Sequence, residues 1–439
     1  MKVRSNDYLP IFRGQQKLSM REKSQFVKSV SYIYNKIRLI SSFLILFLVT
    51  NVFSTDKKVI TAQLVENGFE NIRIKIENAR ILIAYENRVY RFEVEALNEV
   101  IKIVVPLIDD REELILIPLN RKIPIIKFLS SIENCKAFLG NKINAQQFID
   151  DSDIKLDVDR EYNLLLDESE FNSSNLRFDL VIKPTMSFEF GPYSDPILAQ
   201  INLAPDIRTG FWKGMRLSYE TIFPLWNELG SRGDSIRTGM VTINQTFRLP
   251  KAFFISTTAG IFSGNRYGFD FEAKKYFGDG NFSLGANFGV TSYIDFSGMT
   301  RILYSNQFLV TGSLSAELRI ETYDLTLGAS IGRYLQKDNS IRFDINREFS
   351  EIEIGFFAIR SFEGVTNGGF TLTIPLFPSK YWNPSLVRLK VAENYSWSYV
   401  VKSNTNDLIG QRYNTGSRIN TFFEKLNPSF VKNTFRKIN

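Results

Sequence analysis

The strongest constraint in this sequence is an alternation of apolar and polar residues with a period of two, which begins near Arg177 and continues toward the C terminus. It is clearest in four segments: 267–274, 282–296, 324–331 and 341–346. In each segment apolar side chains occupy one parity, and glycine or polar side chains occupy most of the other. Successive side chains of a strand point to opposite faces, so the pattern predicts long strands with one apolar and one polar face.

Such strands suit either a soluble β-sandwich or an outer-membrane β-barrel, and the aromatic content favours the barrel. Aromatic residues make up 14% of the chain, and 38 of them are phenylalanine. Several lie near segment ends, where a membrane interface would hold them: Phe211, Trp212, Tyr276, Phe277, Tyr381 and Trp382. The strands also reach the roughly 9–11 residues of a tilted membrane strand. We therefore predict a mostly β fold in which residues 177–400 form an antiparallel outer-membrane barrel of about 12–14 strands, with an even number expected.

The first 54 residues have the layout of a signal peptide. Basic residues from Arg21 to Arg38 precede the apolar run 39–53, and Ser54 is a small residue close to a cleavage position. The run has about 15 residues, whereas a helix needs about 20 to span a bilayer. We predict that residues 1–54 are a signal peptide, with Met20 as an alternative start; a permanent transmembrane anchor is the weaker interpretation.

The next segment, residues 61–140, has mixed periodicity that predicts a small α+β domain in the periplasm. The expected elements are a helix stopped by Gly68, an alternating strand within 71–85, a helix within 90–105, and short buried strands at 114–118 and 123–128.

Residues 141–176 are rich in Asp, Asn, Ser and Glu, which predicts an acidic linker. Asp151, Asp153, Asp157 and Asp159 could alternatively ligate Ca²⁺, but the central glycine and closing glutamate of an EF-hand loop are missing. Residues 401–439 form a C-terminal tail for which three interpretations remain open: a plug, a periplasmic extension or a further strand.

Composition excludes several classes of function. The chain contains no histidine, which removes His-dependent hydrolases and imidazole metal sites, and its single cysteine, Cys135, cannot form an internal disulfide. The net charge of +7 resides in residues 1–54, which hold nine of the 54 basic and two of the 47 acidic residues. The remainder is neutral, so we expect no nucleic-acid partner. We also expect no catalytic residues, metal or cofactor, and therefore no enzyme.

The polar parity of the predicted strands supplies the candidate functional residues. If the polar face lines a barrel lumen, charged and amide side chains there could meet the hydroxyl groups of a glycan. The candidates for the lumen are Asp270, Glu272, Lys274, Asn287, Asp295, Arg342, Asp344 and Glu348. The alternative is that these polar side chains only pair with one another across a filled interior.

Four stretches resemble the YjbH/GfcD family of exopolysaccharide and capsule proteins. LVENGFENIRIKIENARILIAYENRVYRFE at 64–93 is similar to the family's small periplasmic repeat. GRYLQKDNSIRFDINREF at 332–349, IEIGFFAIRSFEG at 352–364 and GGFTLTIPLFP at 368–378 are similar to its closing strands. The resemblance implies an outer-membrane barrel that works with a polysaccharide export or assembly system, and it carries over no catalytic residue.

These observations lead to one functional expectation and one alternative. We expect a non-catalytic outer-membrane protein of a Gram-negative bacterium, with membrane lipid, polysaccharide and other envelope export proteins as partners. A general porin or surface adhesin is the alternative. A soluble module beside a barrel ordinarily docks another component. A porin works without such a component, so the domain at 61–140 favours the first expectation.

Overall fold

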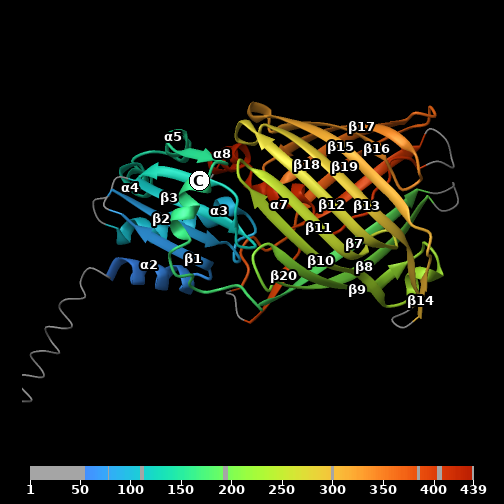
Figure 1. Cartoon of the computed structure of the whole chain (residues 1–439), viewed down its shortest axis with the longest axis horizontal. Coiled ribbons are helices and arrows are strands. Elements are labelled where there is room, and N and C mark those ends of the chain that lie inside the picture. Colours follow the sequence, from blue (N-terminus) through green and yellow to red (C-terminus); the bar gives the residue numbers. More distant parts are fainter. Residues whose placement is uncertain are drawn as a thin grey trace, which may run out of the picture. The chain divides into compact units, whose positions relative to one another are not determined.

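The computed structural model describes residues 55–77, 79–108, 113–190, 196–297, 301–382, 386–402 and 408–437. The predicted signal peptide, residues 1–54, lies outside these described residues, and residues 57–439 form one compact unit. The described chain is mostly β, with one small mixed sheet and one large sheet that is antiparallel apart from a single strand pair (Figure 1). Among the described helices, none combines the length and the hydropathy needed to cross a membrane.

The small sheet has the order β1-β2-β3-β5-β6, and β4 pairs with β3. Its strands are β1 (Glu70–Ile76), β2 (Arg80–Glu86), β3 (Glu113–Asn120), β4 (Ile123–Pro124), β5 (Lys127–Ser131) and β6 (Asp153–Lys155). The accompanying helices are α2 (Thr55–Glu66), α3 (Glu93–Val104), the 3-10 helix η2 (Val105–Leu107), α4 (Ile132–Leu139), α5 (Ala145–Asp150) and α6 (Asp159–Leu165). We call these elements the small domain.

Apolar sequence explains the small domain's core. Strands β2 and β3 pair in parallel and are joined through α3, and parallel strands covered on both faces are apolar throughout. Accordingly every residue from 81 to 85 is fully buried. Helix α3 contributes Leu97, Val100 and Val104, which its 3.6-residue period places on one buried face.

Two predictions for this part of the chain need correction. The strand expected within 71–85 is a hairpin of β1 and β2. Residues 141–176, expected to be a linker, contain α5, β6 and α6, and β6 pairs with β5. Composition misled here because most aspartates of this segment lie on exposed positions, while Phe148, Ile154 and Leu165 between them are buried in the core.

The large sheet contains 15 strands in the described residues, against the 12–14 predicted. They are β7 (Phe178–Phe190), β8 (Ile197–Thr209), β9 (Met215–Asn227), β10 (Arg237–Leu249), β11 (Phe253–Phe262), β12 (Arg266–Phe277), β13 (Phe282–Ser297), β14 (Arg301–Tyr304), β15 (Leu309–Ile320), β16 (Leu325–Arg333), β17 (Asn339–Phe349), β18 (Ile352–Ser361), β19 (Thr366–Pro375), β20 (Val387–Val391) and β21 (Asn394–Lys402). Neighbouring strands follow chain order from β7 to β19, except that the short β14 pairs only with β13.

The first and last strands in the order of the large sheet, β20 and β21, follow one another in the sequence. Strand β20 pairs in parallel with β7, whereas β21 pairs antiparallel with β19, and only Ala392 and Glu393 separate them. The rings of Trp397 and Tyr399 on β21 contact Phe188 and Phe190 on β7, with centroid distances of 6.2 and 5.3 Å. If β20 and β21 are counted as one interrupted strand, the order holds thirteen strands. The expectation of a wholly antiparallel set was wrong, because β20 and β7 run parallel.

The faces of the large sheet are inverted relative to a soluble protein. On β12, Phe269 is 43% exposed while its neighbour Asp270 is 2% exposed. The same contrast separates exposed Phe247 and Leu284 from buried Thr246 and Ser283 on β10 and β13. We call the side that carries Asp270 the polar face and the opposite side the apolar face.

The tail, residues 408–437, runs along the polar face and ends against the small domain. It forms α7 (Ile419–Phe423), the 3-10 helix η6 (Glu424–Leu426) and α8 (Pro428–Phe435). Its first part contacts the end of the sheet distant from the small domain, where the Gly410 N–H donates to Asp338. Phe435 at its last turn packs on Phe138 and Phe148 of the small domain's core. The sequence left three interpretations of the tail open. The described tail residues form helices and loops, so the interpretation as a further strand was wrong.

Candidate functional site

The polar face and the tail enclose a cavity of about 670 Å³. Strands β12, β13 and β15 to β19, together with β21, supply one wall, and tail residues supply the other. Six of the eight residues predicted for the lumen line this cavity: Glu272, Lys274, Asn287, Arg342, Asp344 and Glu348. The two-residue period and the strand register bring them together, because Glu272 on β12 stands directly opposite Asn287 on β13.

Asp270 has a different role from its predicted neighbours, because it anchors the tail. The Tyr413 hydroxyl donates to its carboxylate over 2.6 Å, and Arg418 forms an ion pair with it at 3.0 Å. Asn287 donates to the same carboxylate at 3.1 Å. The buried charge is thus fully partnered, as a carboxylate with 2% exposure requires.

Asp295 lies apart from the other candidates. It lines a second cavity of about 810 Å³, together with Lys183, Glu220 and Arg237. Strand β13 is 16 residues long, so Asp295 lies near its end distant from the small domain. Ile294 and Phe296, which have the opposite parity, line the same cavity, so parity alone could not predict where Asp295 lies.

Ion pairs balance the charge of the first cavity. Lys274 pairs with Glu317 and Arg319 pairs with Glu348, at 2.5 and 2.6 Å. Arg342 forms a two-pronged contact with Asp344, at 2.6 and 2.8 Å. The cavity walls therefore carry hydrogen-bond donors and acceptors, and their positive and negative side chains balance. This suits a hydroxyl-rich ligand that is neutral or weakly charged.

Sequence reasoning missed the partners of these residues. Glu317 and Arg319 lie on the polar parity of β15 and could have been found by extending the alternation to 309–320. Arg412 and Arg418 lie in the tail, where no periodicity indicates which strand each one meets. The Ile419 N–H donates to Glu272 over 2.9 Å, a contact that side-chain chemistry cannot reveal.

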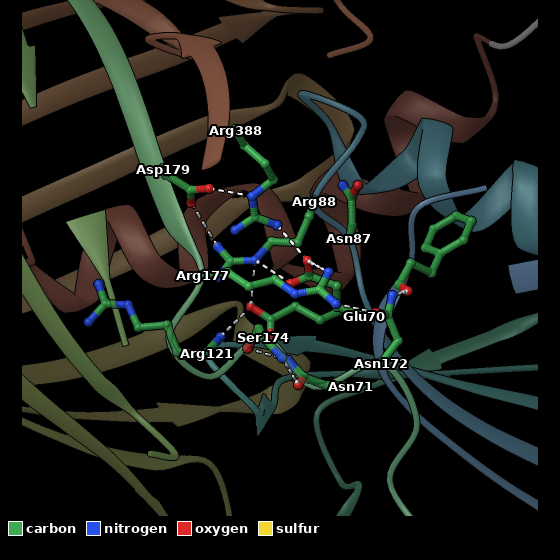
Figure 2. Close-up of polar contacts among 12 residues, drawn as sticks. Glu70, Asn71, Asn87, Arg88, Arg121, Asn172, Ser174, Arg177, Asp179 and Arg388 are labelled. Atoms are coloured by element: carbon green, nitrogen blue, oxygen red, sulfur yellow. Dashed lines mark hydrogen bonds and ion pairs between the residues drawn. The ribbon is translucent and has the colours of Figure 1, made fainter. Parts of the chain in front are cut away.

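A second polar cluster joins the small domain to the large sheet (Figure 2). Glu70 of β1 is fully buried and forms ion pairs with Arg177 at 2.7 Å and with Arg388 of β20 at 2.8 Å. Arg388 also pairs with Asp179 at the start of β7, and Arg88 lies 3.4 Å from the same carboxylate. Residues from three distant stretches of sequence therefore meet at this junction.

Burial raises the pKa values of several groups in the small domain, among them Glu93 and Cys135. The carboxyl of Glu93, in the first turn of α3, has its pKa raised to about 8. The thiol of Cys135 has its pKa raised to about 11, so it is a thiol at neutral pH and a poor nucleophile. Among the described residues, no group of three or more potential metal ligands is assembled.

Comparison with known proteins gives one match. The family model described as exopolysaccharide biosynthesis protein YbjH matches residues 17–385. No curated protein and no solved structure matches the chain. The match includes the small domain and the large sheet through β19, and it confirms the resemblance found in the sequence. Because it covers most of the chain, the protein belongs to the YjbH family of exopolysaccharide biosynthesis proteins.

Proposed function

We propose that this protein is a non-catalytic outer-membrane β-barrel that takes part in exopolysaccharide or capsule export or assembly. In this proposal the large sheet closes between β7 and the β20–β21 segment, and the small domain lies in the periplasm. Closure leaves no unpaired strand edge in hydrocarbon, where an unsatisfied amide is costly. The family's description supports the link to exopolysaccharide.

The observation that carries the proposal is the inversion of the two faces of the large sheet. Phenylalanine and aliphatic side chains cover the face that solvent reaches, for example Leu314 at 63%, Phe343 at 59% and Phe356 at 59% exposed. An apolar surface of this extent is unstable in water but stable against lipid chains. The polar face in turn holds the charged and amide groups that a hydrated glycan needs.

The tail favours an assembly or gated export role over a general porin. It crosses the polar face from the distal end of the sheet to the small domain, and Asp270 and Glu272 hold it by hydrogen bonds. A porin requires a permanently open aqueous path, and the tail occupies that space. The small domain grips the end of the tail through Phe435, so a partner of this domain could control its position.

A deletion strain tests the proposal. Removing the gene should reduce surface polysaccharide and leave the uptake of small hydrophilic solutes unchanged, and the wild-type gene should restore the polysaccharide. Unchanged polysaccharide with reduced solute uptake would contradict the proposal and support a porin.

The same strain can carry a chain truncated after Lys402. Reconstituted in a planar bilayer, the truncated chain should conduct ions more than the full chain does, because the tail no longer fills the interior. Equal conductance of the two chains would show that the tail is not the obstruction.

A further inference from the structure

The turn between β3 and β4 carries a buried cation into the large sheet. Arg121 and Lys122 both have left-handed backbone angles, with φ of 51° and 63°. Their N–H groups fix the turn by donating to the two carboxylate oxygens of Glu86, each over 2.9 Å. The Arg121 guanidinium then reaches β10, where Nη1 donates to Asn244 over 2.6 Å.

Arg121 is incompletely satisfied in this position. The residue is 7% exposed, and its Nε has no hydrogen-bond partner among the described residues. In Figure 2 its guanidinium group lies to the side of the Glu70 network. Burial, followed by the positive charges of Arg216, Arg208 and Arg88, lowers the pKa of this guanidinium.

Two further arginines approach from the large sheet. Arg208 of β8 and Arg216 of β9 line the same small cavity as Arg121, a cavity of about 30 Å³. Arg208 forms an ion pair with Asp206. The Arg216 side chain makes no hydrogen bond or ion pair with the part of the chain that the structure describes.

The lining of this cavity is strongly cationic. Its charged members are Arg88, Arg121, Lys122, Arg177, Asp179, Arg208 and Arg216. The one acidic member, Asp179, already pairs with Arg388 and Arg88. Carboxylates lie near the guanidinium groups of Arg121 and Arg216, but neither group forms a direct ion pair with the described residues. Burial makes such a pair valuable.

We propose that Arg121, Arg208 and Arg216 form a binding site for an oxyanion, and that its ligand is the carboxylate of an acidic sugar in the polymer. A cavity of about 30 Å³ holds about two water-sized groups, which suits the two oxygens of a carboxylate but not a whole sugar ring. The forked guanidinium is the side chain best matched to this geometry.

The position of the arginines favours a glycan over a membrane lipid. Arg208 and Arg216 lie on the polar parity of their strands, whereas the adjacent residues Ile207 and Leu217 are 47% and 37% exposed on the apolar face. A ligand bound there lies on the side of the sheet that holds the polar cavities. The choice of a sugar as ligand rests on the proposed function, while the binding of an oxyanion does not.

Calorimetric titration of the full chain in neutral detergent tests the site. The probes are an oligomer of glucuronic acid, the matching glucose oligomer, inorganic phosphate and micelles that contain phosphatidylglycerol. The wild-type chain should bind the glucuronic acid oligomer and not the glucose oligomer. Arg216→Gln should weaken this binding at least tenfold, Arg216→Lys should weaken it less, and added salt should weaken it in all chains.

Arg347→Gln is the matched control, because Arg347 lies on β17 over the Phe349 ring and away from the site. Equal binding by Arg216→Gln and the control would overturn the site, provided that both variants keep the wild-type unfolding temperature. Binding of phosphatidylglycerol or phosphate alone would overturn the choice of a sugar. If no probe binds but the deletion strain still loses its polysaccharide, the site fails and the proposed function stands.

Discussion

The small domain and the large sheet place their apolar side chains in opposite ways, inside in the first and on the outer face in the second. In the small domain, residues such as Ile83 and Leu116 are enclosed on both faces of a sheet, and polar groups lie at the surface. In the large sheet, Phe343 faces outward while Asp270 and Asn244 are buried among partners. The comparison teaches that alternation of apolar and polar residues shows that the two faces of a sheet have different surroundings. It does not show which of the two faces contacts water. Four substitutions can break or sharpen it.

The largest effect is expected from a charge in the small domain's core. Ile83→Asp places an unpaired carboxylate where the side chain is fully buried, and it should destabilise the domain by at least about 5 kcal/mol. Limited proteolysis of the detergent-solubilised chain should then cleave within residues 57–176. Thr326→Asp, which adds a carboxylate beside Arg319 in the polar cavity, is the control and should leave the pattern unchanged.

A smaller loss is expected where the tail meets the small domain. Phe435 is fully buried against Phe138 and Phe148, so Phe435→Ala should cost about 3–5 kcal/mol. The neighbouring Arg436 forms an exposed ion pair with Asp150 and an exposed hydrogen bond to Asn433, and Arg436→Ala should cost less than about 1 kcal/mol. Denaturant titrations of both variants provide the measurement. Equal losses would show that α8 is not anchored through its aromatic ring.

The apolar face gives a test of intermediate size. Phe343→Arg should destabilise the protein in lipid bilayers by about 2–4 kcal/mol, because the charge must enter hydrocarbon. Phe343→Leu serves as its control and should change little. Folding titrations in liposomes would measure both. An arginine tolerated as well as the leucine would contradict contact of this face with lipid.

The smallest effect concerns Glu93 and pH. Its folded-state pKa is raised from the ordinary 4.5 to about 8, so the folded chain binds more protons than the unfolded chain between these values. Stability should therefore fall as pH rises from about 4.5 to 8 and then level off. Glu93→Gln should remove this slope and stabilise the domain at pH 8.5 by about 1–3 kcal/mol. Unfolding measured at pH 5 and pH 8.5 decides the matter, and an unaltered slope in the variant would refute it.

Periodicity allowed much of the large sheet to be predicted. The faces, the strand lengths and the shared cavity of Glu272, Arg342 and Asp344 all follow from a period of two combined with antiparallel neighbours. The parallel pairing of β20 with β7 does not follow, because nothing local to residues 387–391 encodes a partner about 200 residues earlier in the chain.

The tail and the arginine site were beyond prediction for a related reason. Their residues meet through tertiary packing: Tyr413 reaches Asp270, and Arg121 reaches Asn244, across more than 100 residues of sequence. A basic side chain in a turn is ordinarily solvated, so Arg121 gave no signal by itself. The left-handed turn, which hydrogen bonds to Glu86 stabilise, directs the Arg121 side chain toward the large sheet.

The direction of β21 has a consequence for biogenesis. This last strand ends at the rim farthest from the small domain, and the residues after it come back to that domain across the polar face. Residues 408–437 are therefore enclosed between the polar face of the large sheet and the small domain. In the proposed barrel, the wall cannot close around residues 408–437 before this segment has been exported, so closure of the wall and docking of the tail must follow export of the tail.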